Sequence, residues 1–198
     1  MTSSSKKFGV RLVTLAAGLA ALIGVAMPLV AGVARSNAKA CGATVKVAEH
    51  VKYVINQYVQ DGMRFAPGTV TVKSGCKLTI EFAAAGQSES HSLSLVKQSD
   101  LPRTAAQMEN CKICKQIASK HLKYPGQPPG PNNPIAHWIV NAGKRGLDVP
   151  GDSIVIAEAK DAPAGHKRVT MTVSARAGTT LYFMCGLHPW MQGKIHVT

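Results

Sequence analysis

Short stretches in which apolar and polar residues alternate recur along most of the chain and predict β-strands. Alternation with a period of two is typical of strands, because successive side chains point to opposite faces of a sheet. Turn-forming pairs such as Pro67-Gly68 and Ser74-Gly75 separate several of these stretches. Many short strands joined by close turns predict an all-β fold, an antiparallel sandwich or barrel. The strands that we predict cover residues 51–59, 69–73, 77–82, 91–96, 135–140, 153–157, 167–173, 180–184 and 194–197.

The alternating strand pattern stops after Lys97 and returns at Ile135, within a segment of residues 98–152. Ser99-Asp100 followed by Leu101-Pro102 is typical of a capped helix start, and residues 103–122 are predicted to be helical. Residues 124–134 are rich in Pro, Gly and Asn, which predicts an irregular surface loop. We therefore expect an inserted helix-plus-loop segment within the all-β fold.

The first forty residues have the pattern of an export signal. Lys6, Lys7 and Arg11 give a positive start, and the 23 residues from 12 to 34 carry no charge. Ala38-Lys39-Ala40 then offers small residues at the two positions that a signal peptidase reads. A run of this length is also long enough to span a bilayer, so an uncleaved anchor remains an alternative. We expect residues 1–40 to be a signal peptide or N-terminal membrane anchor, and residues 41–198 to form one domain.

The formal net charge of the chain is +13, and part of it lies in the export segment. Five basic residues precede Cys41, which leaves 18 basic against 10 acidic residues, or +8. A basic surface can bind nucleic acid, anionic lipid or an acidic protein. The alternative is a solvated basic surface with no binding role. The chain carries no RNA-binding or helix-turn-helix signature, so we expect no nucleic-acid partner. An acidic protein or a membrane surface is the favoured partner.

A thiol, an imidazole and a thioether follow the last long predicted strand, 180–184. Cys185, His188 and Met191 have the spacing C-x2-H-x2-M. Copper that cycles between Cu(I) and Cu(II) is suited by a thiolate, two imidazoles and a distant thioether. One tight loop supplies three of these groups, so the fourth must come from elsewhere. His91 is the best candidate, because it begins a predicted strand after a flexible polar stretch. We predict one type 1 copper ion bound by His91, Cys185, His188 and Met191.

This loop resembles that of the cupredoxin family, of the amicyanin and plastocyanin kind. The pattern Cys-x-x-His-Pro-aromatic-Met is present, with Pro189 and Trp190 before the Met. The similarity extends to Phe65-Ala66-Pro67 and to Ser90-His91-Ser92. The resemblance implies a Greek-key β-sandwich with copper at one end. It also implies that His91, Cys185 and His188 are equatorial ligands and Met191 the axial one.

The resemblance further implies that the protein carries single electrons between partners and is not an enzyme. In such proteins the histidine at the position of His188 usually lies in an exposed apolar patch, which Pro189 and Trp190 would extend here. We expect redox protein partners outside the cytoplasm, in the periplasm or at the inner membrane, and a monomeric protein. A periplasmic copper carrier or assembly factor is the alternative. A cupredoxin enzyme with an open copper position is a third hypothesis, against which Met191 argues.

The chain departs from the family in the separation of His91 and Cys185, which are 94 positions apart. The extra chain is roughly residues 98–152, and long excursions of this kind often carry function. It contains Cys111-Lys112-Ile113-Cys114, which no His follows, so c-type haem attachment is excluded.

Five cysteines leave four to pair if Cys185 is a metal ligand. The preferred pairing is Cys41 with Cys76 and Cys111 with Cys114, which suits an oxidising compartment. Two alternatives stay open for the cysteines of the insertion. They are a second metal site together with His121, and a thiol redox pair.

Overall fold

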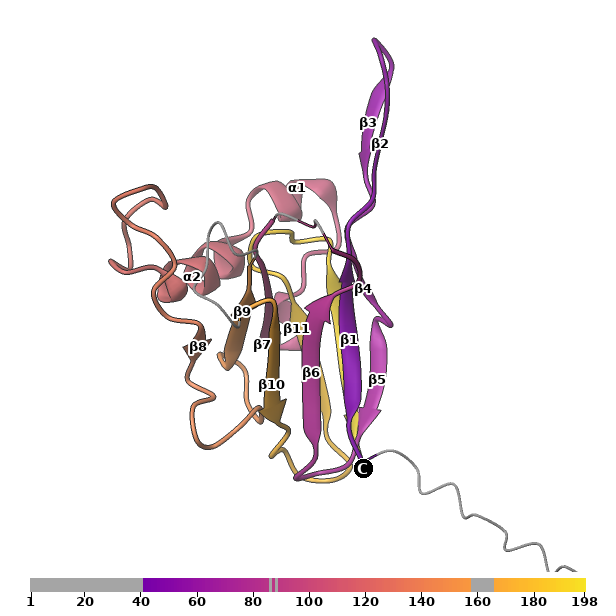
Figure 1. Cartoon of the computed structure of the whole chain (residues 1–198), viewed down its shortest axis with the longest axis vertical. Helices are drawn as coiled ribbons and strands as arrows, with labels where there is room; N and C mark the ends of the chain where they lie inside the picture. The colour runs from indigo at the N-terminus through magenta and orange to yellow at the C-terminus, as the bar shows by residue number, and fades with distance from the viewer. Residues whose placement is uncertain (1–40, 86, 88, 158–165) are drawn as a thin grey trace, which may run out of the picture. The chain divides into compact units, whose positions relative to one another are not determined.

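The computed structural model describes residues 41–85, 87, 89–157 and 166–198, which fold into two packed β-sheets (Figure 1). The predicted export segment, residues 1–40, lies outside the described residues. Apart from β1–β6 and β5–β12, which are parallel, the described strand pairs are antiparallel. One sheet has the order β10(Arg168–Thr172)-β6(Lys77–Phe82)-β1(Ala43–Ala48)-β4(Arg64–Ala66). The other has the order β5(Thr69–Val72)-β12(Gln192–Val197)-β11(Thr180–Met184)-β7(His91–Val96)-β9(Ser153–Ile156)-β8(Ile139–Val140).

The predicted all-β fold with an inserted helix-plus-loop segment is confirmed. Neighbouring strands are mostly distant in sequence, as the crossovers of a Greek-key sandwich require. The core between the sheets is built from the inward side chains of both. Phe183 on β11 is fully buried and meets Phe65 on β4 edge to face, with ring centroids 5.0 Å apart. This sandwich holds the two chain segments that carry the predicted metal ligands.

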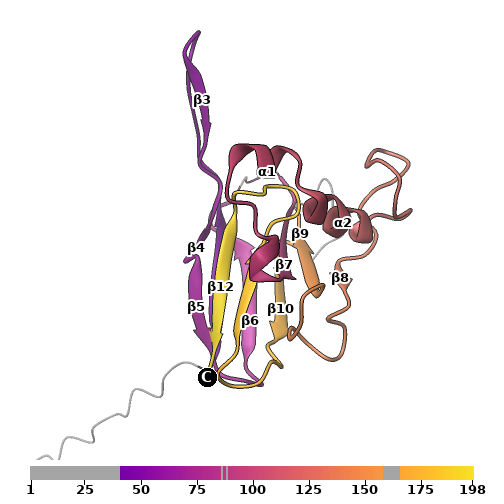
Figure 2. The same ribbon diagram turned by 180° about the vertical axis from the view of Figure 1, so that it is seen from behind.

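The central strand β7 is buried on both faces, which alternation alone did not predict. His91, Leu93 and Leu95 point into the sandwich, and Ser92 and Ser94 point the other way and are equally buried. The insertion between β7 and β9 covers this outer face of the six-stranded sheet, as Figure 2 shows from behind. A second apolar cluster of buried residues fills the space between them, made of Val96, Cys111, Cys114, Ile117 and Met184.

The insertion forms two short helices where the sequence predicted one helix over residues 103–122. A 3-10 turn, η1 (Gln98–Asp100), leads into α1 (Ala105–Glu109), whose N-cap Thr104 accepts a hydrogen bond from the Gln107 amide. The helix then breaks, because Cys111 adopts an extended conformation and caps the start of α2 (Lys112–His121). The break turns α2 onto the outer face of the sheet, where Ile117 is buried.

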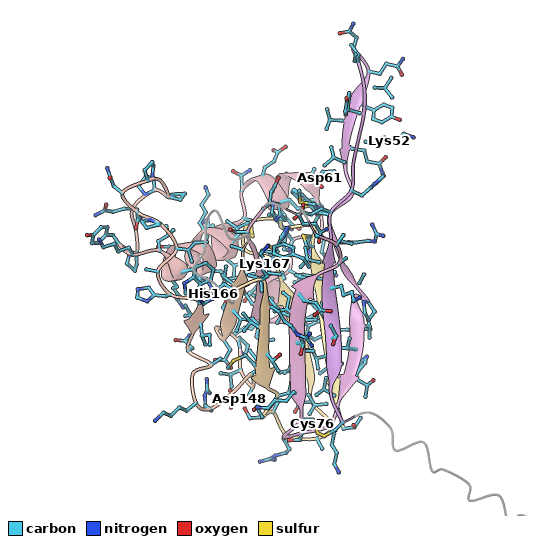
Figure 3. All side chains as sticks on the ribbon, in the orientation of Figure 1. Lys52, Asp61, Cys76, Asp148, His166 and Lys167 are labelled. Atoms are coloured by element: carbon cyan, nitrogen blue, oxygen red, sulfur yellow. A yellow bond between two sulfur atoms is a disulfide. The ribbon has the colours of Figure 1, made fainter. Side chains whose placement is uncertain are left out.

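The strand predicted over residues 51–59 is instead a hairpin of β2 (Val51–Val54) and β3 (Tyr58–Asp61). Asn56 in the turn has a positive φ of 59°, a conformation that suits Asn and reverses the chain. Figure 3 shows the side chains of the hairpin, with Lys52 and Asp61 labelled, standing clear of the sandwich. Tyr53 and Val59 face each other across the hairpin and are 69% and 75% exposed. The apolar pattern therefore predicted that these residues form strands, but it did not predict that their side chains are exposed.

Other differences concern strand ends and short strands. Of the strand predicted over residues 135–140, only residues 139–140 form a strand, β8. Ile135 instead forms an isolated β-bridge with Leu122. Strands β1 and β4 were not predicted, since both are completed by partners distant in sequence. Among the described residues, no helix is long and apolar enough to cross a bilayer.

Both preferred disulfides are confirmed. Cys41 pairs with Cys76, and Cys111 pairs with Cys114, which leaves Cys185 as the free thiol. The hypothesis of a second metal site at Cys111, Cys114 and His121 is wrong, because both sulfurs are in the disulfide. His121 is hydrogen-bonded to Ser153 and to the carbonyl of His137.

Candidate metal centre

The chain after β11 folds into a tight loop that collects three of the predicted ligands. The Cys185 amide donates to the Met191 carbonyl at 3.0 Å, and the Met191 amide donates to the His188 carbonyl at 2.9 Å. These backbone bonds close the C-x2-H-x2-M segment upon itself before β12 begins at Gln192. Met191 is 1% exposed, so its thioether is held inside the protein on the same loop.

The structure brings His91, Cys185 and His188 together although 94 positions separate the first two. Antiparallel pairing of β11 with β7 places Met184 opposite Ser94, so the chain beyond β11 passes the start of β7. The Nδ1 atoms of the two histidines are 3.1 Å apart, and Cys185 Sγ lies 3.6 Å from His188 Nδ1. The ligand atoms of the three residues all lie within 4.8 Å of one another. The three groups therefore surround one point.

Two carboxylates fix the orientation of the imidazoles. His91 Nε2 lies 3.1 Å from Glu49 Oε1, and His188 Nε2 lies 2.9 Å from Glu89 Oε2. An ionised carboxylate only accepts hydrogen bonds, so each Nε2 donates. Nδ1 of His188 then faces Cys185 Sγ, to which it donates when protonated, and binding a metal displaces that proton. Sequence reasoning missed Glu49 and Glu89, since no local pattern marks either as a partner of a histidine.

The Cys185 thiolate and the His188 imidazolium each stabilise the charged form of the other. Complete burial would raise the pKa of Cys185, but hydrogen bonds and charge from His188 and His91 outweigh it and lower the pKa to about 5. Burial lowers the pKa of His188, whereas Cys185 and Glu89 raise it more, so its pKa ends above the ordinary value. Without a metal, Cys185 is therefore a thiolate at neutral pH. A thiolate is the form that binds copper.

In the metal-free protein, the ultraviolet absorbance of the Cys185 thiolate is expected to titrate with a midpoint of about pH 5, not near 9.0. Because the folded pKa lies below the unfolded one, the thiolate contributes stability that is complete above pH 9 and is lost as the pH falls towards 5. Urea unfolding of the metal-free chain should therefore show stability rising from pH 5 to pH 9 relative to Cys185→Ser. A midpoint near 9 would show that the histidines do not act on this sulfur.

Ser92 ties the two ligand segments together. Its backbone amide donates to Cys185 Sγ at 3.4 Å, and its Oγ accepts from the Gly186 amide at 2.8 Å. Hydrogen bonds to the sulfur tune the potential of such a centre. From Ser92 a chain of buried hydrogen bonds runs outward through Ser94 and Ser153 to His121.

His121 anchors this chain in the insertion. Its ring contacts Ser153 Oγ at 2.6 Å on one side and donates to the His137 carbonyl on the other. Burial lowers the pKa of His121, more than the hydrogen bond to His137 raises it. Sequence reasoning considered His121 only as a ligand, and the available signal was its place on the buried face of a helix.

The donor set fits copper. One thiolate, two imidazoles and one thioether are the ligands that accept both Cu(I) and Cu(II). The residues that would hold the ion are fully or almost fully buried and are oriented by partners outside the site. A β-sandwich that presents a His-Cys-His cluster with a methionine on the same loop fits a type 1, or blue, copper protein that holds one copper ion.

Solved structures similar to this chain are cupredoxins, the family that the sequence resembles. Auracyanin from Roseiflexus castenholzii is 16% identical, with 80% of this chain and 97% of that chain covered and a TM-score of 0.37. Auracyanin A from Chloroflexus aurantiacus is 20% identical, with coverage of 79% and 99% and a TM-score of 0.35. Rusticyanin from Thiobacillus ferrooxidans is 13% identical, with coverage of 80% and 78% and a TM-score of 0.30.

No protein-family model and no curated protein matches the sequence. Because the TM-scores of the solved structures lie below 0.5, the interpretation of the site rests on its own geometry.

Proposed function

We propose that the protein carries single electrons between redox partners outside the cytoplasm, through one type 1 copper ion. His91, Cys185 and His188 would be the equatorial ligands and Met191 the axial one. The observation that carries the proposal is the convergence of Cys185 Sγ and two Nδ1 atoms at one buried point. Bound copper would supply the one-electron redox chemistry.

The protein's own contribution to such a function is rigidity. Glu49 and Glu89 hold the imidazole rings, and backbone hydrogen bonds hold the loop, so ligand positions change little between oxidation states. Little rearrangement favours fast electron transfer. Ligands that hydrogen bonds fix in position also argue against a copper carrier, because a carrier must release its ion easily. We expect no catalytic activity, since Met191 is buried at the position that an open site leaves to substrate.

A docking surface for the partners would lie around His188. Leu187 and Trp190 flank this histidine and are 45% and 41% exposed, and the Trp190 ring meets the His188 ring edge to face at 5.4 Å. An apolar contact next to the ligand would place a partner close to the metal. The surplus of basic residues after position 40 favours an acidic partner through long-range attraction. We expect the protein to act as a monomer.

The predicted location is the periplasm or another extracytoplasmic space, with or without an N-terminal membrane anchor. Two disulfides support export, because such bonds persist in oxidising compartments. The sequence pattern of residues 1–40 supports the same location.

The copper-loaded protein is expected to be intensely coloured when oxidised and to bleach reversibly on reduction by one electron per copper. Voltammetry measures the electron count, and a competition titration with a Cu(I) chelator measures retention of the metal. Azide should leave the visible spectrum unchanged, because no coordination position is open. Ready transfer of copper to the chelator would favour the carrier hypothesis, and a spectral change with azide would favour an enzyme.

A further inference from the structure

A second sulfur group lies at the start of α2, within the insertion. Cys111 is the N-cap residue of this helix, and its Sγ accepts a hydrogen bond from the Cys114 amide at 3.2 Å. The helix N-terminus carries partial positive charge, which lowers the pKa of a cysteine placed there. The same charge would stabilise Cys111 as a thiolate whenever its disulfide with Cys114 is opened.

The basic residues of α2 itself act in the same direction. Lys112 and Lys115 lie within the first turns of α2 and are exposed, and α2 contains no acidic residue. Glu109, at the end of α1, and Asp100, which lines a cavity together with Cys111, act in the opposite direction. Positive charge beside a cysteine pair favours the thiolate forms that take part in disulfide exchange.

This disulfide also constrains the chain much less than the other one. Its cysteines are 3 positions apart in sequence, whereas Cys41 and Cys76 are 35 apart. The entropy of the opened chain grows with the length of the loop that a disulfide closes. By loop length alone, opening Cys111–Cys114 shifts the folding equilibrium roughly 30-fold less than opening Cys41–Cys76 does, so the fold is expected to persist when it opens.

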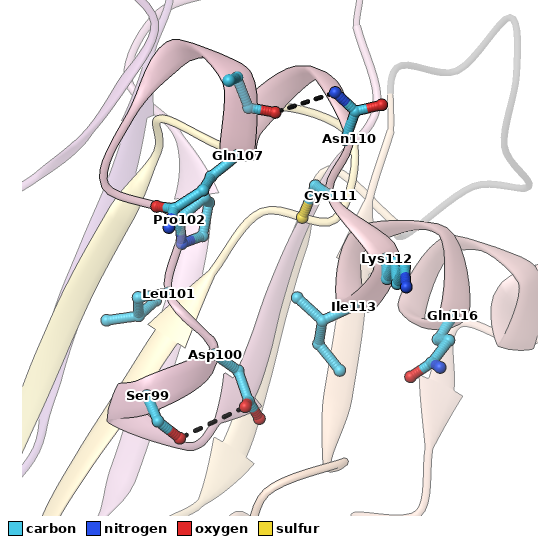
Figure 4. Close-up of a pocket in the computed structure, with 11 residues that line it drawn as sticks. Ser99, Asp100, Leu101, Pro102, Gln107, Asn110, Cys111, Lys112, Ile113 and Gln116 are labelled. Carbon is cyan, nitrogen blue, oxygen red and sulfur yellow. Dashed lines mark hydrogen bonds between the residues drawn. The ribbon is translucent and has the colours of Figure 1, made fainter.

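Two cavities border the pair. A cavity of about 580 Å³ lies between η1, α1 and the start of α2, and Cys111 forms part of its wall (Figure 4). A second cavity, of about 920 Å³, is bordered by both cysteines and by Gly186 and Leu187 of the ligand loop. Each cysteine keeps a small exposed fraction, 6% for Cys111 and 4% for Cys114. An incoming sulfur would approach through the larger cavity, which both cysteines border.

We infer that Cys111–Cys114 is a thiol–disulfide exchange site for a dithiol protein, distinct from the copper centre. A partner thiolate attacks Cys111 Sγ, the bond between the two sulfurs breaks, and Cys114 leaves as a thiolate. The partner's second thiolate then attacks the partner's own sulfur and releases Cys111. Two electrons pass to the cysteine pair, the partner becomes a disulfide, and the two protons that it loses balance the two that the pair takes up.

The exchange site lies directly against the copper-binding loop. A Cβ built at Gly186 would come within 2.8 Å of Ile117 Cγ2 and 3.4 Å of the Cys114 carbonyl oxygen. Gly186 follows Cys185, so the start of α2 packs directly against the loop that carries the predicted ligand. Opening the disulfide removes a covalent constraint from this part of α2.

The test incubates the full-length protein with reduced thioredoxin as the dithiol probe. Free thiols are then alkylated and each cysteine is scored by peptide mapping, so that Cys185 is counted separately. Cys111 and Cys114 are expected to become alkylated while Cys41 and Cys76 stay paired and the circular dichroism stays native. If Cys111–Cys114 opens only when the fold is lost, or only after Cys41–Cys76, the inference is overturned.

Charge variants test the chemistry of the site. The double variant Lys112→Gln/Lys115→Gln is expected to slow the exchange by roughly twofold to fivefold, the effect of a charge near a helix end. The matched control Lys120→Gln, in the last turn of the same helix, should exchange at the original rate. Equal rates for the double variant and the original chain would contradict the role assigned to this helix start. Neither result depends on copper, so failure here leaves the proposed electron transfer untouched.

Discussion

Replacing Cys185 by Ser is expected to abolish the intense visible absorption of the copper-loaded protein. The colour of a type 1 site requires a thiolate bound to Cu(II), and a serine hydroxyl does not replace it. Copper affinity should fall by more than about 100-fold, because even loss of a group that only orients a ligand costs about 10–100-fold. Optical spectra and a copper titration of the variant measure both effects.

Met184→Leu is the matched control for this experiment. It removes a fully buried sulfur one position away and keeps a similar side-chain volume. Met184 belongs to the cluster under the insertion, so its loss should leave the visible band in place. Retention of the band in Cys185→Ser, or its loss in Met184→Leu, would mean that the wrong sulfur has been assigned.

Phe183→Ala is expected to cause the largest loss of stability, about 3–5 kcal/mol in the free energy of unfolding. The Phe183 ring is fully buried, packs against Phe65, and lies over Gly193 so closely that a Cβ there would come within 2.3 Å of it. Neighbours held on two strands cannot close the space that the ring leaves. Urea unfolding of the original and variant chains measures the difference.

Ile55→Ala serves as the control for the stability measurement. Ile55 lies in the turn of the β2–β3 hairpin and is 78% exposed, so truncation should change the free energy of unfolding by less than about 0.5 kcal/mol. A small effect at Phe183 would show that the two sheets do not pack as described. A large effect at Ile55 would show that the hairpin is covered in solution.

The strand that leads into the metal-binding loop was predictable because its pattern and its environment agree. Strand 180–184 matches β11 at both ends, since its apolar and aromatic run is bounded by Gly178 before it and by Gly186 after it. The loop that follows was predictable because its ligand spacing is set by the geometry of a single ion. His91 was found because the same ion requires a second imidazole.

What the sequence did not reveal depends on contacts between distant segments. Ser92 and Ser94 have the polar character of an exposed face, yet the insertion buries them and their hydrogen bonds lead to His121. Glu49 and Glu89 orient the imidazoles from outside the ligand motif. No local periodicity encodes such partners, because they are chosen by the packing of the whole domain.

The hairpin and the broken helix show a different limit. Residues 51–59 have the composition of a strand, but a reversal at Asn56 divides them and no sheet covers them. Residues 103–122 have helical composition, but the disulfide-forming Cys111 caps a new helix inside them. In both segments one residue with a special backbone role outweighs the average tendency of its neighbours.

X-ray absorption at the copper edge of the loaded protein tests most directly whether one thiolate and two imidazoles share a single ion. The account predicts one short copper–sulfur distance and two nitrogen neighbours in both oxidation states, with little change between them. A shell of nitrogen and oxygen atoms without the short sulfur would contradict it.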